Sequence, residues 1–138
     1  MYLIDTDTLS LAHREQRDVN RRILATPADQ LFIAVVTVEE TMRGCLADIN
    51  ASARNPSRLI VAYDRLQIVH GFLMKWNVLP LDHEAAKTYA DLVKRKVRVH
   101  TNDLRIAAIA LSCNFIVVTA NVRHFQRVPT LRVEDWTR

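Results

Sequence analysis

Apolar and polar positions follow two alternating patterns along this chain. Short apolar runs predict strands over residues 2–4, 31–36, 78–81 and 115–118, with a weaker strand over 131–133. Between them, apolar residues recur at steps of three and four and predict helices over residues 10–25, 37–49, 55–76, 82–96 and 101–111, with a short helical turn from 122. Because the strands are continuously apolar and alternate with helices, we expect an α/β fold. Its central parallel sheet should be flanked by helices on both faces.

Helix starts and buried faces can also be read from the pattern. Thr37 and Glu40 have the spacing of a capping box, which predicts that a helix begins there. Thr101 and Asn102 should cap a helix that is apolar on nearly every side and therefore deeply buried. Residues expected to face the core elsewhere are Leu59, Ala62, Tyr63, Leu66, Val69, Leu73 and Trp76, then Ala86, Tyr89, Ala90 and Val93.

Size and composition narrow the class of protein. A chain of 138 residues is typical of one domain, so we expect a single domain over residues 1–138. Its net charge of +4 favours a partner that carries phosphates, although many basic proteins bind no nucleic acid. Cys45 and Cys113 lack the spacing of a zinc or redox pair, which fits a reducing cytoplasm. No apolar run reaches the roughly 18 residues that span a bilayer, so neither export nor a membrane role is expected.

Acidic and polar residues gather where the predicted strands end. Asp5 follows the first strand, Glu40 lies just past the second, and Thr119 and Asn121 follow the strand over 115–118. Asp103 opens the buried helix and should point at the same edge. In parallel sheets, functional groups collect beyond the carboxyl ends of the strands. We therefore expect one site at this edge.

Each acidic residue also has a purely structural explanation. Asp5 could cap the next helix, Glu40 could complete the capping box, and Asp103 could stabilise a helix dipole. Their convergence is what favours function. Carboxylates held close together raise one another's pKa unless a cation neutralises them, which indicates a hard divalent metal such as Mg²⁺ or Mn²⁺. Such an ion can activate water for the in-line cleavage of a phosphodiester.

Several segments carry a family resemblance over essentially the whole chain. The sequence resembles VapC-type PIN domains at residues 2–9, 37–40, 101–108, 119–125 and 128–136. That resemblance implies a PIN-like fold and a Mg²⁺- or Mn²⁺-dependent endoribonuclease that acts as the toxin of a toxin–antitoxin pair. It further implies a VapB-like antitoxin partner, an RNA substrate and a homodimer. Asp5, Glu40 and Asp103 fall on the family's acidic positions, which makes them the expected metal ligands and, with Asn121, the expected catalytic residues.

The sequence departs from the family beside these three acids, at the positions of Asn121 and His124, which we call the fourth corner of the site. Family members often carry an acidic residue or Asn at the position of Asn121, and many have an acidic residue at the position of His124. Asn121 could offer an oxygen to a water on the metal, and His124 could contact RNA or act as a base. The lost negative charge should weaken a second metal site. Asp7 stands where Asn is usual and could restore some charge, although a helix cap is the favoured interpretation.

Supporting residues are expected around this centre. Thr6 and Thr119 should orient Asp5 and the neighbouring loop through their hydroxyl groups. Three basic residues are expected to contact RNA: Arg98, Arg105 and Arg123.

Two other functions compete with the nuclease. The chain could be a PIN-like module that binds RNA or protein and whose catalysis is weakened by Asn121 and His124. The segment 5–9 also resembles the loop of haloacid-dehalogenase-like phosphatases. With only Gly44 and Gly71, however, the chain lacks the second loop that such an enzyme needs.

Overall fold

A single parallel sheet forms the centre of the molecule. The computed structural model describes all residues 1–138. The strands are β1 (Tyr2–Ile4), β2 (Leu31–Ala34), β3 (Asn77–Leu79), β4 (Ile116–Val118) and β5 (Val133–Glu134). Their order is β3-β2-β1-β4-β5, and every neighbouring pair is parallel. Ile4 is in register with Ile33 and with Val118, so the central strands end at one edge.

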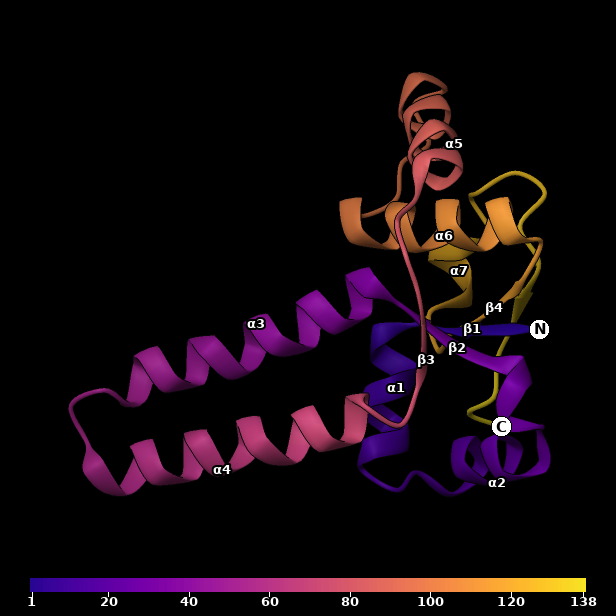
Figure 1. The fold of residues 1–138 in the computed structure, drawn as a ribbon. Helices are drawn as coiled ribbons and strands as arrows, with labels where there is room; N and C mark the ends of the chain where they lie inside the picture. The colour runs from indigo at the N-terminus through magenta and orange to yellow at the C-terminus, as the bar shows by residue number, and fades with distance from the viewer.

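Helices cover both faces of this sheet, as predicted. They are α1 (Thr6–His13), α2 (Arg17–Ala25), α3 (Val35–Ser52), α4 (Pro56–Leu73), α5 (His83–Lys94), α6 (Thr101–Cys113) and α7 (Val122–Phe125), with a 3₁₀ turn at Ala28–Gln30. In Figure 1, α5, α6 and α7 lie above the sheet, and α1 and α2 lie below it. The sequence-based expectation of an α/β fold with a parallel sheet is therefore confirmed.

Each face of the sheet has its own apolar core. Above, residues 106–110 of α6 are completely buried and pack with Leu3, Val117 and Phe125. The prediction of a deeply buried helix is confirmed. Below, Trp136 joins residues of α1, α2, α3 and α4 in a second core, and its ring lies 5.0 Å from the ring of Tyr2. The carboxyl ends of the central strands are thus fixed from both sides.

The predicted helix over residues 10–25 is wrong, because two helices replace it. The helix α1 begins earlier, at Thr6, and ends at His13. Glu15 has a φ of 60°, a left-handed conformation that no helix interior accommodates, and the chain turns there. Gln16 then caps α2 by accepting a hydrogen bond from the Val19 N–H at 2.7 Å. This break has no signal in the sequence, because neither a glycine nor a proline lies there.

Three further boundaries differ from the prediction. Strand β2 ends at Ala34 and α3 begins at Val35, so Thr37 lies in the first helical turn and does not cap it. Likewise, α6 begins at Thr101 with His100 at the cap position and no side-chain cap. The last strand, β5, begins two residues later and ends one residue later than expected. Polar residues in a first helical turn resemble caps in sequence, which explains both errors at helix starts.

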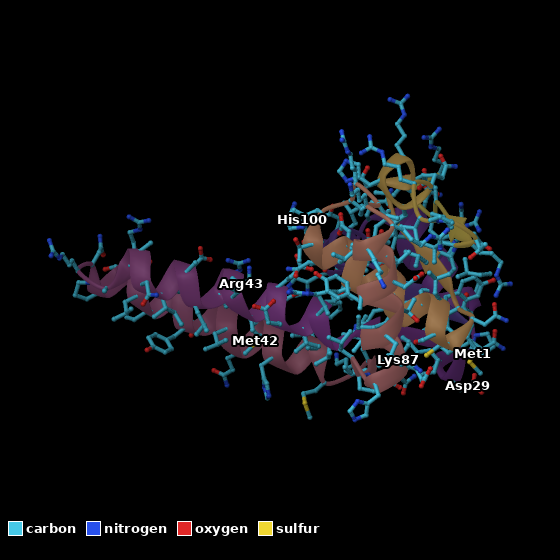
Figure 2. The ribbon with its side chains drawn as sticks, turned by 90° about the horizontal axis from the view of Figure 1, so that it is seen from above. Met1, Asp29, Met42, Arg43, Lys87 and His100 are labelled. Atoms are coloured by element: carbon cyan, nitrogen blue, oxygen red, sulfur yellow. The ribbon has the colours of Figure 1, made fainter.

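The pair α3 and α4 forms an arm that extends beyond the sheet (Figures 1 and 2). Its base is buried at Val69 and Leu73, as predicted, but Tyr63 farther out is 54% exposed.

The predicted core face of α5 is also wrong. Ala85 and Leu92 are buried, whereas the expected inner positions Ala86, Ala90 and Val93 are exposed. A helix that packs on one neighbour buries a narrow stripe, which alanine-rich spacing leaves undetermined.

Candidate active site

Asp5 lies at the carboxyl end of the central strand. Its backbone N–H donates to the Val118 carbonyl at 3.0 Å, which extends the pairing of β1 and β4 by one bond. Its side chain caps α1, with Oδ1 accepting from the Thr8 N–H at 2.8 Å. The cap prediction for Asp5 is confirmed, but capping uses only one carboxylate oxygen. Only 3% of the residue is exposed, so this is a buried acid at the sheet edge.

Burial controls the protonation of Asp5. Loss of water raises the pKa of Asp5 from 3.8 to about 6, although hydrogen bonds from the Thr119 and Thr8 hydroxyls and from the Thr8 N–H oppose the shift. The nearby charge of Asp7 raises the pKa of Asp5 further. No cationic side chain is among the groups that shift this pKa. The fold therefore holds a carboxylate whose charge is poorly compensated by the protein itself.

Glu40 is positioned by a residue from another helix. Its Oε1 accepts a hydrogen bond from the Thr6 hydroxyl at 2.7 Å, and the Thr37 hydroxyl lies 3.2 Å from the same Thr6 oxygen. The capping-box explanation of Glu40 is wrong, because α3 begins two residues before Thr37. The expectation that Thr6 orients Asp5 is corrected too, since its hydroxyl binds Glu40.

Asp103 lies in the first turn of α6, with 27% of its side chain exposed. Burial is the main cause that raises the pKa of Asp103, followed by the charge of Glu40 and, after an opposing effect of His100, that of Asp7. Glu40 and Asp7 are thus close enough to Asp103 to repel its charge. Asp7 does not cap α1, because Asp5 does, and the favoured cap interpretation of Asp7 is wrong. The structure gathers these carboxylates at one edge.

His124, on α7, faces Asp103. Its Nδ1 lies 3.8 Å from Asp103 Oδ2 and is completely buried, with no hydrogen-bond partner. The charge of His124 lowers the pKa of Asp103, which opposes the repulsion from the carboxylates. The neighbouring Asn121 is partly buried, and its amide side chain makes no hydrogen bond to the chain. Both residues at the fourth corner therefore have unused polar atoms.

Threonine hydroxyls fix the loop that carries Asn121. The Asn121 N–H donates to Thr119 Oγ1 at 2.9 Å, and the Ala120 N–H donates to Thr8 Oγ1 at 3.1 Å. Thr119 therefore orients both the loop and Asp5, as expected. Thr8 was missed, although it is fully buried and links α1 to this loop. The only signal was its place in the polar run that follows β1.

Comparison with known proteins identifies the family. A family model described as PIN domain matches residues 2–131. A tRNA(fMet)-specific endonuclease VapC of Shigella flexneri is 38% identical over 140 residues, covering 99% of this chain and 98% of the relative. The chain belongs to the VapC ribonucleases of the PIN-domain family. Ribonuclease VapC1 of Haemophilus influenzae strain R2866 is similar too, at 29% identity over 100% of this chain and 99% of the relative.

Solved structures agree with this assignment. The DNA-bound VapBC structure from Salmonella typhimurium contains a chain with a TM-score of 0.77 at 27% identity, covering 98% of this chain and 97% of that one. VapBC-1 from nontypeable Haemophilus influenzae gives a TM-score of 0.75 at 24% identity, with 99% and 98% covered, and shows the likeness of the fold alone. None of the helices of this chain is both long and apolar enough to cross a membrane.

The three arginines expected to contact RNA differ in their exposure and in their contacts with the rest of the protein. Arg105 is engaged inside the protein, since its Nη1 donates to Asn102 Oδ1 at 2.9 Å and its guanidinium lies 5.6 Å from the Tyr89 ring centre. Arg98 and Arg123 are exposed. Arg127 donates to the Arg98 carbonyl at 3.2 Å and so stabilises the loop before α6. Arg105 thus has a structural role that joins α5 to α6.

A metal ion fits the donors at this edge. No three His, Cys, Asp or Glu side chains are arranged closely enough to hold one ion alone. Mg²⁺, however, usually binds one or two carboxylates and keeps several waters, so a complete protein cage is not required. The carboxylates repel one another, and the buried Nδ1 of His124 has no partner. A cation would relieve both conditions.

A hollow of about 480 Å³ lies between α1, α3 and α4, on the side of the site where Glu40 lies. Glu40 and Thr6 line its inner end, and Arg14 and Arg65 line its walls. Of the three acids of the site, only Glu40 lines this hollow, so the hollow reaches one side of the site, where Arg14 and Arg65 supply positive charge. Figure 2 shows His100, at the start of α6, on the side of the sheet that faces the arm, whereas Met1 and Asp29 lie on the far side.

Proposed function

We propose that this chain, over residues 1–138 as one PIN unit, is a Mg²⁺- or Mn²⁺-dependent endoribonuclease and the toxin of a toxin–antitoxin pair. One observation carries the metal-dependent part of this proposal. The charge of Glu40, from α3, raises the pKa of Asp103, on α6, at the edge of a sheet that also presents the buried Asp5. Acids gathered in this way are stable as anions when a divalent cation neutralises them.

Asp5, Glu40 and Asp103 are the proposed metal ligands. Because no three acidic or histidine side chains lie close enough to hold one ion alone, some of them would bind the ion through its waters. When bound, the ion supplies Lewis acidity, which favours ionisation of water and neutralises charge on a phosphodiester. Thr6 holds Glu40 in place, while Thr8 and Thr119 hold Asp5 and the loop before α7. Asn121 has an unused amide at the same edge, from which it can orient water or a phosphate oxygen.

The exposed cations suit an RNA substrate. Arg98 and Arg123 are exposed on the loop before α6 and on α7, the two elements that carry Asp103 and His124. Phosphate contacts of this kind supply affinity that does not depend on sequence, and they weaken as salt increases. Arg105 contributes indirectly, because it holds the start of α6 through Asn102.

Partner proteins form the second half of the proposal. A solved structure from Mycobacterium tuberculosis, 26% identical with a TM-score of 0.59, is described as a member of the VapBC family of toxin-antitoxin systems, which supports a VapB-like antitoxin for this chain. The arm of α3 and α4 exposes Leu46, Ile60, Val61, Tyr63 and Ile68. Such an apolar surface suits a protein partner, and we propose a homodimer in addition to the antitoxin. Both cysteines are free thiols, which is compatible with the proposed cytoplasmic location.

The competing function is a binding module without catalysis. Neither Asn121 nor His124 adds negative charge to the fourth corner, which is the observation that favours it. The presence of Asp5, Glu40 and Asp103 argues against a binding module, since such a module needs no carboxylates that repel one another at the sheet edge.

A cleavage assay with a matched control separates these functions. The purified chain should cleave structured RNA in Mg²⁺ or Mn²⁺ and lose activity in chelator. Asp103→Asn should reduce cleavage by at least about 100-fold, on the scale of lost transition-state stabilisation at a metal site. Asp29→Asn changes an exposed acid on the opposite side of the molecule and should leave cleavage unchanged (Figure 2). RNA binding without cleavage by the native chain would establish the binding module instead.

A further inference from the structure

The buried nitrogen of His124 is the polar atom at the site that the fold leaves without a partner. Its Nδ1 is fully covered although 43% of the side chain is exposed. Solvent therefore reaches the outer part of the ring, while the inner nitrogen faces Asp103. Buried polar atoms in native proteins nearly always have a partner, and an orphan of this kind indicates an unseen ion or water.

The distance between His124 Nδ1 and Asp103 limits what can join the two side chains. Nδ1 lies 3.8 Å from Asp103 Oδ2. That separation is too long for a direct hydrogen bond, which ends near about 3.2 Å. It is short enough for one shared metal ion, because two ligands that each lie about 2.1 Å from an ion are at most about 4.2 Å apart. The geometry thus suits a bridging cation better than a direct contact.

We infer that His124 is a nitrogen ligand of the site metal, beside Asp103, and that it shifts the preference of the site from Mg²⁺ to Mn²⁺. This inference rests on the proposed metal site. Mg²⁺ is a hard ion that binds oxygen and dehydrates reluctantly, whereas imidazole suits first-row transition ions. A neutral imidazole in place of the acidic residue of other members also removes a negative charge from the site. This loss should lower the affinity for Mg²⁺ more than the affinity for an ion that gains a bond to nitrogen.

The neighbouring His100 provides a control for charge alone. It also lowers the pKa of Asp103, so its imidazole is near, but it is exposed, and the histidine that pairs with that carboxylate is His124. If the effect of His124 were only electrostatic, removing either histidine should have a similar effect. Ligation requires the buried nitrogen and predicts an effect for His124 alone.

The experiment measures metal binding by the full chain without RNA. Mn²⁺ is titrated by electron paramagnetic resonance with Mg²⁺ as competitor, and pulsed spectra report coupling between bound Mn²⁺ and imidazole nitrogen. The native protein should prefer Mn²⁺ and show the nitrogen coupling. His124→Asn should lose the coupling and bind Mn²⁺ on the order of 10-fold more weakly, with Mg²⁺ binding unchanged. His124→Asp should strengthen Mg²⁺ binding, and His100→Asn should match the native protein.

Bound Mn²⁺ without nitrogen coupling in the native spectrum overturns the inference, and this result requires no variant to fold. An unchanged Mn²⁺ preference in folded His124→Asn overturns it as well. In either case, metal-dependent RNA cleavage can persist, so the proposed function survives. If the chain binds neither ion and does not cleave RNA, both the proposed function and the inference fail.

Discussion

The Thr6 hydroxyl donates a 2.7 Å hydrogen bond to Glu40 Oε1, across 34 residues of sequence. Thr6 is the first residue of α1, directly after Asp5, and Glu40 lies in the second turn of α3. One hydroxyl thus couples the two proposed ligands that follow neighbouring strands. The bond fixes a long, flexible side chain whose carboxylate would otherwise move away from the repelling charge of Asp103.

Thr6→Val should therefore weaken cleavage more than stability. Valine keeps the shape but removes the donor, so we expect metal-dependent RNA cleavage to fall by about 10-fold or more. The free energy of unfolding should decrease by only about 1 kcal/mol, the net value of one hydrogen bond. Thr6→Ser restores the hydroxyl and should recover most of the activity. Equal activity of the valine and serine variants would contradict the positioning role.

Asp5→Asn should stabilise the metal-free protein at neutral pH. Because the folded pKa of Asp5 is about 6 and the ordinary value is 3.8, folding favours the protonated acid. The penalty for the buried carboxylate is absent below pH 3.8, increases between pH 3.8 and about 6, and is constant above. Its size is about 3 kcal/mol, at 1.36 kcal/mol for each pKa unit. Asparagine is neutral and can still accept the Thr8 N–H bond.

Urea unfolding in chelator, at several pH values, measures this effect. The variant should be more stable than the native chain by about 2–3 kcal/mol at pH 8, and the two should converge near pH 4. Added Mn²⁺ should reverse the order, because an ion that binds only the folded native protein stabilises it by mass action. A stability difference that did not depend on pH would contradict a charge-based cause.

The hydrophobic pattern was sufficient to predict the sheet, because buried parallel strands are continuous apolar runs. The positions of Asp5 and Asp103 in the fold were predicted correctly for the same reason. Asp5 directly follows a predicted strand, and Asp103 lies in the first turn of the predicted buried helix. Glu40 was predicted at the correct edge of the sheet, but the structural explanation considered for it, a capping box, was wrong. Its capping box depended on a helix start that the structure places two residues earlier, and helix starts are the least determined part of such patterns.

The contacts between distant residues could not be predicted. Nothing in the polar run after β1 distinguishes Thr8, which is buried and binds the loop before α7, from Asp7, which is exposed. The break at Glu15 depends on a left-handed residue that is neither Gly nor Asn. The exposed arm has the same apolar spacing as a core helix, because the spacing does not record what covers it.

Thr8→Val should loosen the loop that carries Asn121. The valine removes the acceptor of the Ala120 N–H and one donor to Asp5, inside a fully buried site. An unsatisfied buried group costs about 1–3 kcal/mol, so the free energy of unfolding should fall by that amount. Hydrogen exchange at the Ala120 amide should become faster. Thr8→Ser keeps the acceptor and should protect this amide as well as the native residue does, apart from a small packing loss.

Trp136 should be the largest single contribution to the core below the sheet. Only 2% of it is exposed, its ring packs edge-on against Tyr2, and its Nε1 donates to Glu134 Oε2 at 2.8 Å. Trp136→Ala should lower the free energy of unfolding by about 3–5 kcal/mol, as expected for a buried aromatic residue.

Trp76→Ala is the matched control, because Trp76 is only partly buried at the end of α4, where it packs against Phe72. It should cost about 1–2 kcal/mol. Because Ile4 and Val118 share the core of Trp136, its loss should also loosen the strand ends that hold Asp5. Metal binding should then weaken in Trp136→Ala and stay unchanged in Trp76→Ala. Equal losses of stability in the two variants would show that the C-terminal segment does not support the sheet edge.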